Sequence, residues 1–342
     1  MREPLVSILL PYRNAEKTLP RCLDSIKQQS CKRWELIAVD DNSTDYSKGI
    51  IIEYSNLDTR IRSFDSCGRG IVDAMNYGIK LARSKFVVRM DADDCMYPQR
   101  LDRLLSFLLN NSQFGLVASK IKYRTDIGSG FCGKGYSRYV DWSNRIITNE
   151  QIYLHQFEES PFAHPSVAFK KSTVDKLGGY RKGNFPEDYE LWLRWLSHGV
   201  RMQKIDEYLL DWYDSADRHS RVCRDYIKES FQKLKAKYLP GWLSNTNYNK
   251  KKISAWGTGK IARRQIKHLV NNHILITTFY EVDKKKIGQE CNGSPILSIE
   301  RICPSNNEFI LILAGARGAR EKILAFLEEK ELTLGQDFLF LA

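Results

Sequence analysis

The chain has 342 residues, 42% of them apolar and 27% charged, and a formal net charge of +12. This composition excludes a disordered or fibrous chain, and the length is too great for one ordinary core, so we expect a globular protein of two domains. All apolar runs are strand-sized, which argues against transmembrane helices and stable membrane insertion.

The first apolar run and the cysteines bear on the cellular compartment. Residues 5–10 are apolar, but Pro11 and Arg13 follow at once, so this run is interpreted as a first strand and not as a signal peptide. The eight cysteines show no CxxC pair and no zinc-ligand spacing. These features predict reduced thiols in a cytoplasmic protein.

The first part of the chain alternates between strand and helix patterns. Strand patterns occur at residues 6–10, 34–39, 61–64 and 86–88, and helix patterns lie between them at residues 19–26, 49–55 and 73–82. Such alternation predicts an α/β fold with a mostly parallel sheet and right-handed crossovers.

Carboxylates follow two of these strands. Asp40 and Asp41 end the second strand, and Asp91, Asp93 and Asp94 follow the fourth. Open α/β sheets bind ligands at this edge, and three like charges so close together require a positive partner, which is typically a divalent cation. The alternatives are a solvated acidic turn at residues 91–94 and a helix cap at residues 40–41.

Two later segments carry candidate side chains for chemistry. Residues 110–160 look irregular, and their aromatic residues are assigned to packing. His164 precedes a strand pattern, and a lone histidine there is more often structural than functional. Glu187 and Asp188 open a helix, where the dipole favours an ionised carboxylate. They are either first-turn caps or a site for a general base.

The positive charge is concentrated in one segment. Between Arg218 and Lys267 there are 14 lysines and arginines and only two acids, so this segment carries the whole net charge. Residues 218–250 are predicted to form a basic helical linker after a first domain at residues 1–217. A polyanionic partner is favoured over the alternative of solvated helix faces.

Residues 251–342 predict a smaller Rossmann-like domain. Strand patterns occur at residues 253–256, 274–280, 309–313 and 338–341, and residues 257–262 fit the GxGxxA spacing at the start of a helix. Glu281 and Asp283 lie near the expected position of a ribose-binding acid. Lys260, Arg263 and Arg264 crowd the helix start, where a nucleic-acid phosphate could bind instead. A docking role is favoured over nucleotide binding.

Five motifs in the first domain resemble, in the same order, those of family-two glycosyltransferases. They are Val6-Ser7-Ile8, Pro11-Tyr12-Arg13-Asn14, residues 35–43, residues 73–78 and residues 89–94. The resemblance spans residues 4–215 and implies the GT-A fold and transfer with inversion at the anomeric carbon.

This resemblance also implies roles for individual residues. The implied donor-binding residues are Pro11, Tyr12, Asn14, Asp40, Asp41, Asp73, Asn76, Arg89 and Asp91. Mn²⁺ or Mg²⁺ would be held by Asp91 and Asp93 with Asp94 in support, and His219 matches a late histidine that some relatives place on the metal. Asp188 would be the general base, with His164 and Glu187 on the acceptor side.

The second half resembles the tail of an animal group of β-1,3-N-acetylglucosaminyltransferase-like proteins. The similar segments are residues 256–260, 263–264, 282–283, 286–287, 295–297 and 335–339. That group is associated with galactosylation of queuosine in tRNA. The resemblance implies a UDP-sugar donor, with UDP-galactose as one candidate, and a tRNA acceptor contacted by Lys260, Arg263 and Arg264.

Three other functions remain open. The same chemistry could act on a cell-surface polysaccharide or a lipid-linked glycan. The chain could be a non-catalytic RNA-binding adaptor, which the intact Asp91, Asp93 and Asp188 argue against. A nicotinamide-dependent oxidoreductase rests on the GxGxxA spacing alone.

Overall fold

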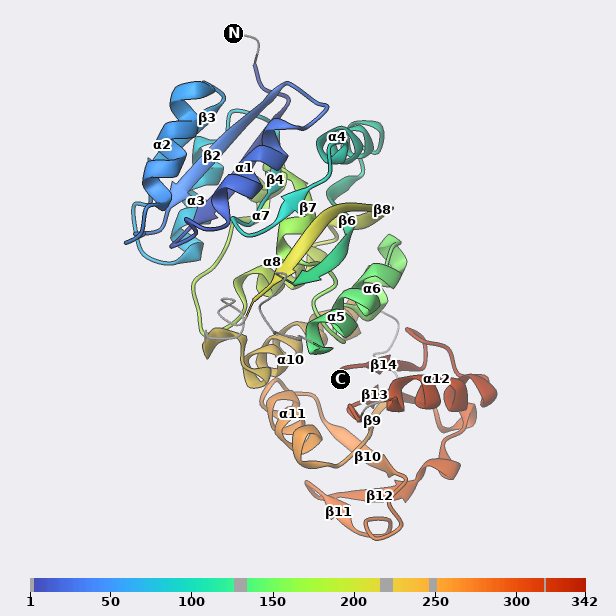
Figure 1. Ribbon diagram of the computed structural model, residues 1–342. Coiled ribbons are helices and arrows are strands. Elements are labelled where there is room, and N and C mark those ends of the chain that lie inside the picture. The colour runs from blue at the N-terminus through green and yellow to red at the C-terminus, as the bar shows by residue number, and fades with distance from the viewer. Residues whose placement is uncertain (1–2, 126–133, 216–223, 246–250, 317) are drawn as a thin grey trace. The chain divides into compact units, whose positions relative to one another are not determined.

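The computed structural model describes residues 3–125, 134–215, 224–245, 251–316 and 318–342 (Figure 1). The chain divides into two compact units. The first comprises Met1–Ile152, Pro161–Gly183 and Glu187–Cys223, and the second Tyr153–Ser160, Asn184–Pro186 and Arg224–Ala342. The chain therefore leaves the first unit and returns to it before the second unit is completed.

The first unit is built on an eight-stranded sheet with the order β3-β2-β1-β4-β7-β6-β8-β5. The strands are β1 (Val6–Tyr12), β2 (Trp34–Asp40), β3 (Ile61–Asp65), β4 (Phe86–Arg89), β5 (Cys95–Met96), β6 (Phe114–Thr125), β7 (Val167–Lys170) and β8 (Arg201–Asp214). The strands β3, β2, β1 and β4 are parallel, whereas β7 runs antiparallel to both β4 and β6. The predicted mostly parallel arrangement holds for the part of the sheet that precedes the acidic turn.

Helices connect and cover these strands. They are α1 (Leu19–Lys27), α2 (Ser47–Leu57), α3 (Ile71–Leu81), α4 (Arg100–Asn110), α5 (Lys134–Arg145), α6 (Asn149–His155), α7 (Lys171–Leu177) and α8 (Glu187–Ser197), with a 3-10 turn η1 at His164–Ser166. The region that looked irregular in sequence thus contains β6, α5 and α6. Tyr136 and Tyr139 of α5 pack edge-on or tilted against Trp212, so these aromatics form core contacts as expected.

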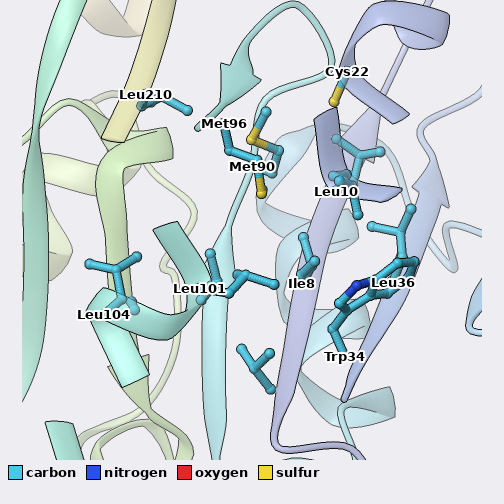
Figure 2. Close-up of a cluster of buried hydrophobic side chains, with 14 of the residues drawn as sticks. Ile8, Leu10, Cys22, Trp34, Leu36, Met90, Met96, Leu101, Leu104 and Leu210 are labelled. Carbon is cyan, nitrogen blue, oxygen red and sulfur yellow. The ribbon is translucent and has the colours of Figure 1, made fainter. Parts of the chain in front are cut away.

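The core of the first unit lies on both faces of the sheet. Successive side chains of a strand point to opposite faces. Ile8 and Leu10 therefore join one buried cluster, with Trp34 and Leu101 among its members (Figure 2), while Leu9 joins a second cluster on the other face. Because β1 is covered on both sides, all seven of its residues are buried. This burial explains its uninterrupted apolar run.

The second unit has a six-stranded sheet with the order β11-β12-β10-β9-β13-β14. The strands are β9 (Lys252–Trp256), β10 (Ile276–Glu281), β11 (Glu290–Cys291), β12 (Ser294–Ser298), β13 (Glu308–Ile312) and β14 (Phe338–Phe340). All neighbouring pairs are parallel except β11 with β12. This is the strand order expected for a Rossmann-like domain.

The helices of the second unit include the predicted basic segment. They are α10 (Lys228–Asn245), α11 (Lys260–Asn271) and α12 (Ala319–Glu329), with 3-10 turns η2 (Arg224–Tyr226), η4 (Ile299–Arg301) and η5 (Pro304–Asn306). Pro240 lies inside α10 without ending it. Leu239, Trp242 and Leu243 are buried around the proline, so tertiary packing holds the helix together there.

A buried lysine ties the short excursion at residues 153–160 into the second unit. The Lys235 ammonium is buried, and it donates to the carbonyl oxygens of Glu158 at 2.7 Å and Leu341 at 2.9 Å. The carboxylate of Glu158 pairs with Arg320 at 2.9 Å. The excursion therefore supplies polar partners that α10 and α12 need inside this unit.

No helix in the described parts of the chain combines the length and the hydrophobicity that spanning a bilayer requires.

Candidate active site

The first unit places its candidate residues where the order of the parallel strands reverses. The strand β1 lies between β2 and β4, so the carboxyl ends of β1 and β4 flank the point at which a ligand crevice is expected. Tyr12 ends β1, Asp40 ends β2 and Arg89 ends β4. The acidic turn at residues 91–94 follows β4 directly.

The acidic turn brings three carboxylates together. One ligand oxygen from each of Asp91, Asp93 and Asp94 lies within 4.8 Å of the others. The backbone of the turn is fixed from α1, because the Arg21 guanidinium donates to the Asp93 carbonyl at 2.8 Å. It is also fixed from β8, where the Tyr213 amide donates to Oδ1 of Asp94 at 2.8 Å. The turn is therefore held in place from two elements.

A buried arginine supplies the positive partner that the sequence required. Nη2 of Arg89 lies 2.6 Å from Oδ1 of Asp91, and the Arg89 side chain is almost fully buried. Behind it, Arg100 donates to the Arg89 carbonyl at 3.1 Å, and burial lowers the pKa of Arg100 to about 10. The turn thus meets positive charge from both Arg89 and Arg100, in addition to the Arg21 guanidinium at its backbone.

The three carboxylates differ in how they can meet a metal ion. Asp94 is fully buried and bonded to β8, so it supports the turn, whereas Asp91 and Asp93 are partly exposed. Carboxylate oxygens are the ligands that Mg²⁺ and Mn²⁺ prefer. The residues present therefore fit a divalent metal, with Asp91 and Asp93 as the carboxylates that reach solvent.

The predicted donor loop is organised by its own polar side chains. Asp40 accepts a hydrogen bond from the Ser43 amide at 3.0 Å, and Asp41 accepts one from the Gly70 amide at 2.8 Å. Asn14 accepts from the Thr44 amide at 2.8 Å and so fastens the end of β1 to this loop. Both carboxylates are buried, and they bond amides of the loops before α2 and α3 without capping the first turn of either helix.

Two residues at the end of β1 are less accessible than the donor-binding role suggests. Pro11 and Tyr12 are both buried, and the Tyr12 ring belongs to the hydrophobic cluster of Figure 2. Burial, followed by the charge of Asp40, raises the pKa of the Tyr12 phenol. The backbone of this position is also engaged, since the Tyr12 carbonyl accepts from the Asp41 amide at 2.8 Å.

Helix α3 contributes Asp73 and Asn76. Oδ2 of Asp73 lies 2.6 Å from the Lys182 ammonium and accepts from the Arg69 amide at 3.0 Å. Asn76 bonds both the amide and the carbonyl of Tyr180, each at 2.9 Å. Both side chains therefore join α3 to the segment that follows α7.

Asp188 lies in the first turn of α8 and is buried. Burial, and then the charge of neighbouring Glu187, raises the pKa of Asp188 to about 8. The Tyr189 amide donates to Oδ1 of Asp188 at 2.7 Å, which opposes part of this rise. A carboxylate with a pKa near the working pH is suited to accept a proton from a hydroxyl group.

His164 is held in a buried polar cluster next to α8. Its Nε2 lies 2.7 Å from the Tyr180 hydroxyl, and its Nδ1 lies 3.9 Å from Oε1 of Glu187. Burial, followed by the charge of Arg89, lowers the pKa of His164 well below its usual value, so the ring is neutral. The structure thus brings His164 and Glu187 beside Asp188, with His164 packed as a core histidine would be.

Sequence reasoning did not single out the ion pair that supports this cluster. Arg194 pairs with Glu190 at 3.1 Å, and both side chains are buried in α8. The same guanidinium donates to the carbonyls of Leu177 and Gly179, each at 2.6 Å. It thereby fixes the turn that carries Tyr180. An acid and a base four residues apart on a helix are the signal that could have revealed the pair.

The remaining predicted residues lie elsewhere. His219 lies outside the described residues. Lys260, Arg263 and Arg264 lie on the exposed side of α11 in the second unit, where Nε of Arg263 donates to the Thr258 carbonyl at 3.0 Å.

Comparison with known proteins connects this site to a family. A model of the family described as Glycosyl transferase family 2 matches residues 7–178, which is half of the chain and contains β1 to β4 and the acidic turn. The protein belongs to glycosyl transferase family 2. It is therefore a glycosyltransferase, and its mixed α/β fold confirms the expected GT-A class.

Three similar proteins illustrate the range of this glycosyltransferase's relatives. The UDP-Gal:alpha-D-GlcNAc-diphosphoundecaprenol beta-1,3-galactosyltransferase of Escherichia coli is 27% identical over 69% of this chain and 82% of its own. The amylovoran biosynthesis glycosyltransferase AmsE of Erwinia amylovora is 28% identical over 71% of this chain and 91% of its own. The mannosyltransferase PcManGT of Pyrobaculum calidifontis, solved with GDP-Man and Mn²⁺, is 16% identical, covers 80% of this chain and 70% of its own, and has a TM-score of 0.50.

The raised pKa of Asp188 predicts a pH dependence for this family 2 enzyme. Only the ionised carboxylate can take a proton, so kcat/KM is expected to rise about tenfold per pH unit below a midpoint near 8 and to level off above it. Initial rates between pH 5.5 and 9.5 would check this expectation. UDP binding measured over the same range is the control, and a flat rate profile would contradict the assignment.

The buried Glu190–Arg194 pair predicts a large stability effect. Replacing Arg194 by methionine removes the nearer of two cations on the buried Glu190 carboxylate, since Arg181 lies 3.5 Å away, and it also removes the donor to the Leu177 and Gly179 carbonyls. The free energy of unfolding is expected to fall by about 3–5 kcal/mol. Urea denaturation would measure the loss, with Lys176→Met on exposed α7 as the control. A double variant, Glu190→Leu with Arg194→Met, should recover part of the loss. A single variant as stable as wild type would refute the role of the pair.

Proposed function

We propose that the protein transfers a sugar with inversion from a UDP-sugar to a hydroxyl group of a polysaccharide or lipid-linked glycan. The supporting observation is that one site brings together an acidic turn and a proton acceptor. The negative charge of Asp91 contributes to the raised pKa of Asp188, so the two acids lie close enough to interact. A transferase needs this combination, because it must bind a diphosphate and deprotonate an acceptor.

In this proposal, Asp91 and Asp93 hold Mn²⁺ or Mg²⁺. When bound, the metal neutralises charge that develops on the leaving diphosphate. Asp188 removes the proton from the acceptor hydroxyl, whose oxygen forms the new bond to the anomeric carbon. The bond from that carbon to the phosphate oxygen breaks, and UDP leaves with the bonding electrons. Attack from the side opposite the leaving group inverts the anomeric configuration.

The roles of the surrounding residues follow from their contacts. The loop formed by Asp40, Asp41 and Asn14 is fixed by hydrogen bonds and offers a preformed wall for the uridine. His164 and Glu187 lie on the acceptor side next to Asp188. The names of two relatives support the donor and acceptor classes, since one uses UDP-Gal and a diphosphoundecaprenol-linked sugar and the other acts in amylovoran biosynthesis.

The donor and the acceptor class can be tested in one experiment. The protein is incubated with UDP-galactose, UDP-glucose, UDP-GlcNAc or GDP-mannose, with Mn²⁺ or EDTA, and with undecaprenyl-diphosphate sugars or queuosine-containing tRNA. Mass spectrometry identifies the product. We expect a UDP-sugar to be consumed only with the metal and a glycosylated lipid-linked product to form. Transfer from GDP-mannose, or turnover in EDTA, would contradict the proposal.

A tRNA acceptor is the second candidate, and one observation favours it. Helix α11 presents Lys260, Arg263, Arg264 and Lys267 to solvent and contains no acidic residue. A row of cations on one helix face suits the phosphate backbone of a nucleic acid. Transfer to queuosine, with these side chains contacting RNA, would then replace the lipid-linked acceptor.

This second candidate has its own test. Replacing Arg264 and Lys267 by glutamate should weaken tRNA binding and lower the salt dependence by about one unit of slope per lost phosphate contact. These two positions are chosen because the Arg263 guanidinium also holds the Thr258 carbonyl. Lys322→Glu on α12 is the control. An unchanged slope would remove α11 from any RNA-binding surface.

A further inference from the structure

The glycine-rich turn of the second unit already contains an anion. This turn, residues 257–262, joins β9 to α11 at the position where a dinucleotide fold binds a diphosphate. The carboxylate of Glu281 lies against it. Oε1 of Glu281 accepts hydrogen bonds from both the amide and the hydroxyl of Thr258, each at 2.9 Å.

The same carboxylate has further donors. The Lys286 ammonium lies 3.2 Å from Oε1 of Glu281, and the Val282 amide donates to Oε2 at 3.1 Å. Burial raises the pKa of Glu281, but the hydrogen bonds from Thr258 and Lys286 outweigh it, so the net pKa is lower than usual. Glu281 is therefore ionised at neutral pH, with both oxygens bonded to the protein itself.

Glu281 also ends β10, which is where a dinucleotide fold places the acid that binds a ribose. A ribose-binding carboxylate needs free oxygen lone pairs toward the sugar. Here those oxygens bond the protein's own turn and lysine. Glu281 therefore occupies the position of a ribose-binding acid, but its carboxylate is bonded to Thr258 and Lys286 of the same unit.

The first glycine of the turn packs closely against the neighbouring strand end. The order of the second sheet reverses between β9 and β13, so a dinucleotide would enter between Gly257 and Ala314. A Cβ atom placed on Gly257 would lie only 3.1 Å from the Ala314 amide nitrogen and 3.3 Å from its Cα. Gly257 also has a φ of +111°, which favours glycine. Its lack of a side chain is therefore explained by chain packing and backbone conformation, without a ligand.

We infer that Glu281 is a resident anion that replaces the diphosphate, so that the second unit folds without a nucleotide and binds no dinucleotide. The Thr258 and Lys286 donors at the turn are satisfied by the chain's own carboxylate. The GxGxxA spacing therefore indicates a turn of the same geometry as in dinucleotide folds, and it does not indicate a bound cofactor. This inference concerns the second unit alone and does not depend on the acceptor of the transfer reaction.

The experiment removes the carboxylate that lies against the turn and supplies inorganic phosphate from solution in its place. Glu281→Ala removes the carboxylate and leaves the Thr258 and Lys286 donors without it. The variant should melt at a lower temperature, and 50 mM inorganic phosphate should raise its melting temperature by about 3 °C more than that of wild type. Glu308→Ala is the matched control, because Glu308 is also bonded by side chains of this unit, Tyr280 and Ser254, but lies away from the turn.

Nucleotide titrations and the melting comparison each support or overturn the inference. Wild type titrated with NADH and NADP⁺ should give no binding up to millimolar concentration by calorimetry. Micromolar binding of either by wild type would overturn the inference. So would a folded Glu281→Ala variant whose response to phosphate equals that of Glu308→Ala. Should Glu281→Ala fail to fold, the titrations of wild type still decide, and Glu281→Gln, which keeps an acceptor oxygen, replaces it in the melting comparison.

Discussion

Replacing Asp93 by asparagine should abolish metal-dependent sugar transfer, with kcat lower by a factor of about 10³ or more, while the protein stays folded. Asp93, like Asp91, is a partly exposed carboxylate of the acidic turn, and its backbone is fixed by Arg21. Asparagine keeps the size of the side chain but removes the charge that would bind a divalent cation. Mn²⁺-dependent UDP binding should therefore be lost together with turnover.

The measurements are initial rates of transfer and calorimetric binding of UDP with and without Mn²⁺. Circular dichroism and the melting temperature check that the variant is folded. Asp175→Asn, on the exposed part of α7, makes the same chemical change away from the site. A folded Asp93→Asn variant with wild-type kcat and Mn²⁺-dependent UDP binding would refute the metal assignment.

Replacing Asp188 by asparagine should have the second largest effect on kcat, and unlike the Asp93 variant it should leave UDP binding intact. The amide cannot accept a proton, so kcat is expected to fall by about 10²–10⁴. UDP binding with Mn²⁺ should persist, because the acidic turn is untouched. Wild-type stability should fall as the pH rises from about 4 to about 8, because there the unfolded chain loses the Asp188 proton that the folded chain keeps, and this fall should be absent in the variant.

Glu187→Gln is the matched control for this prediction. It removes the neighbouring acid but keeps Asp188, so a large part of the activity should remain. Because the charge of Glu187 raises the pKa of Asp188, its loss should move the midpoint of the pH–rate profile to lower pH. If Glu187→Gln abolished transfer while Asp188→Asn did not, the base would be Glu187.

The part of the fold that surrounds the acidic turn could be predicted from local patterns. The apolar run marks β1 as a buried strand, although the strand continues through Pro11 to Tyr12 instead of turning there, and the pattern of β2 places Asp40 at its end. Strand ends meet at one edge of a parallel sheet, so the acids after β2 and β4 could be placed at one site from sequence. The pattern also placed Glu187 and Asp188 in the first turn of a helix, as α8 has them, whereas the role of Asp188 as a base came from the resemblance and stays a prediction.

Other features depend on contacts between distant residues and could not be predicted in this way. The role of Arg194 requires the carbonyls of the turn at 177–179 to come near α8. Pro240 suggests a helix end, but the buried side chains on both sides of it keep α10 continuous. Glu281 has the spacing of a ribose-binding acid, and only its hydrogen bonds show that the chain itself uses the carboxylate.

The excursion at residues 153–160 limits where the chain of this enzyme can be cut into fragments or recombined with a relative. A fragment that starts at Arg224 would contain α10 and both halves of the second sheet but would lack Glu158, an acceptor for the buried Lys235 and the anion beside Arg320. Such a fragment should be insoluble or partly unfolded unless a peptide covering 153–160 is added. Recombination at the sequence boundary near residue 224 would therefore separate Lys235 and Arg320 from these partners, and viable exchanges should transfer the excursion together with the tail.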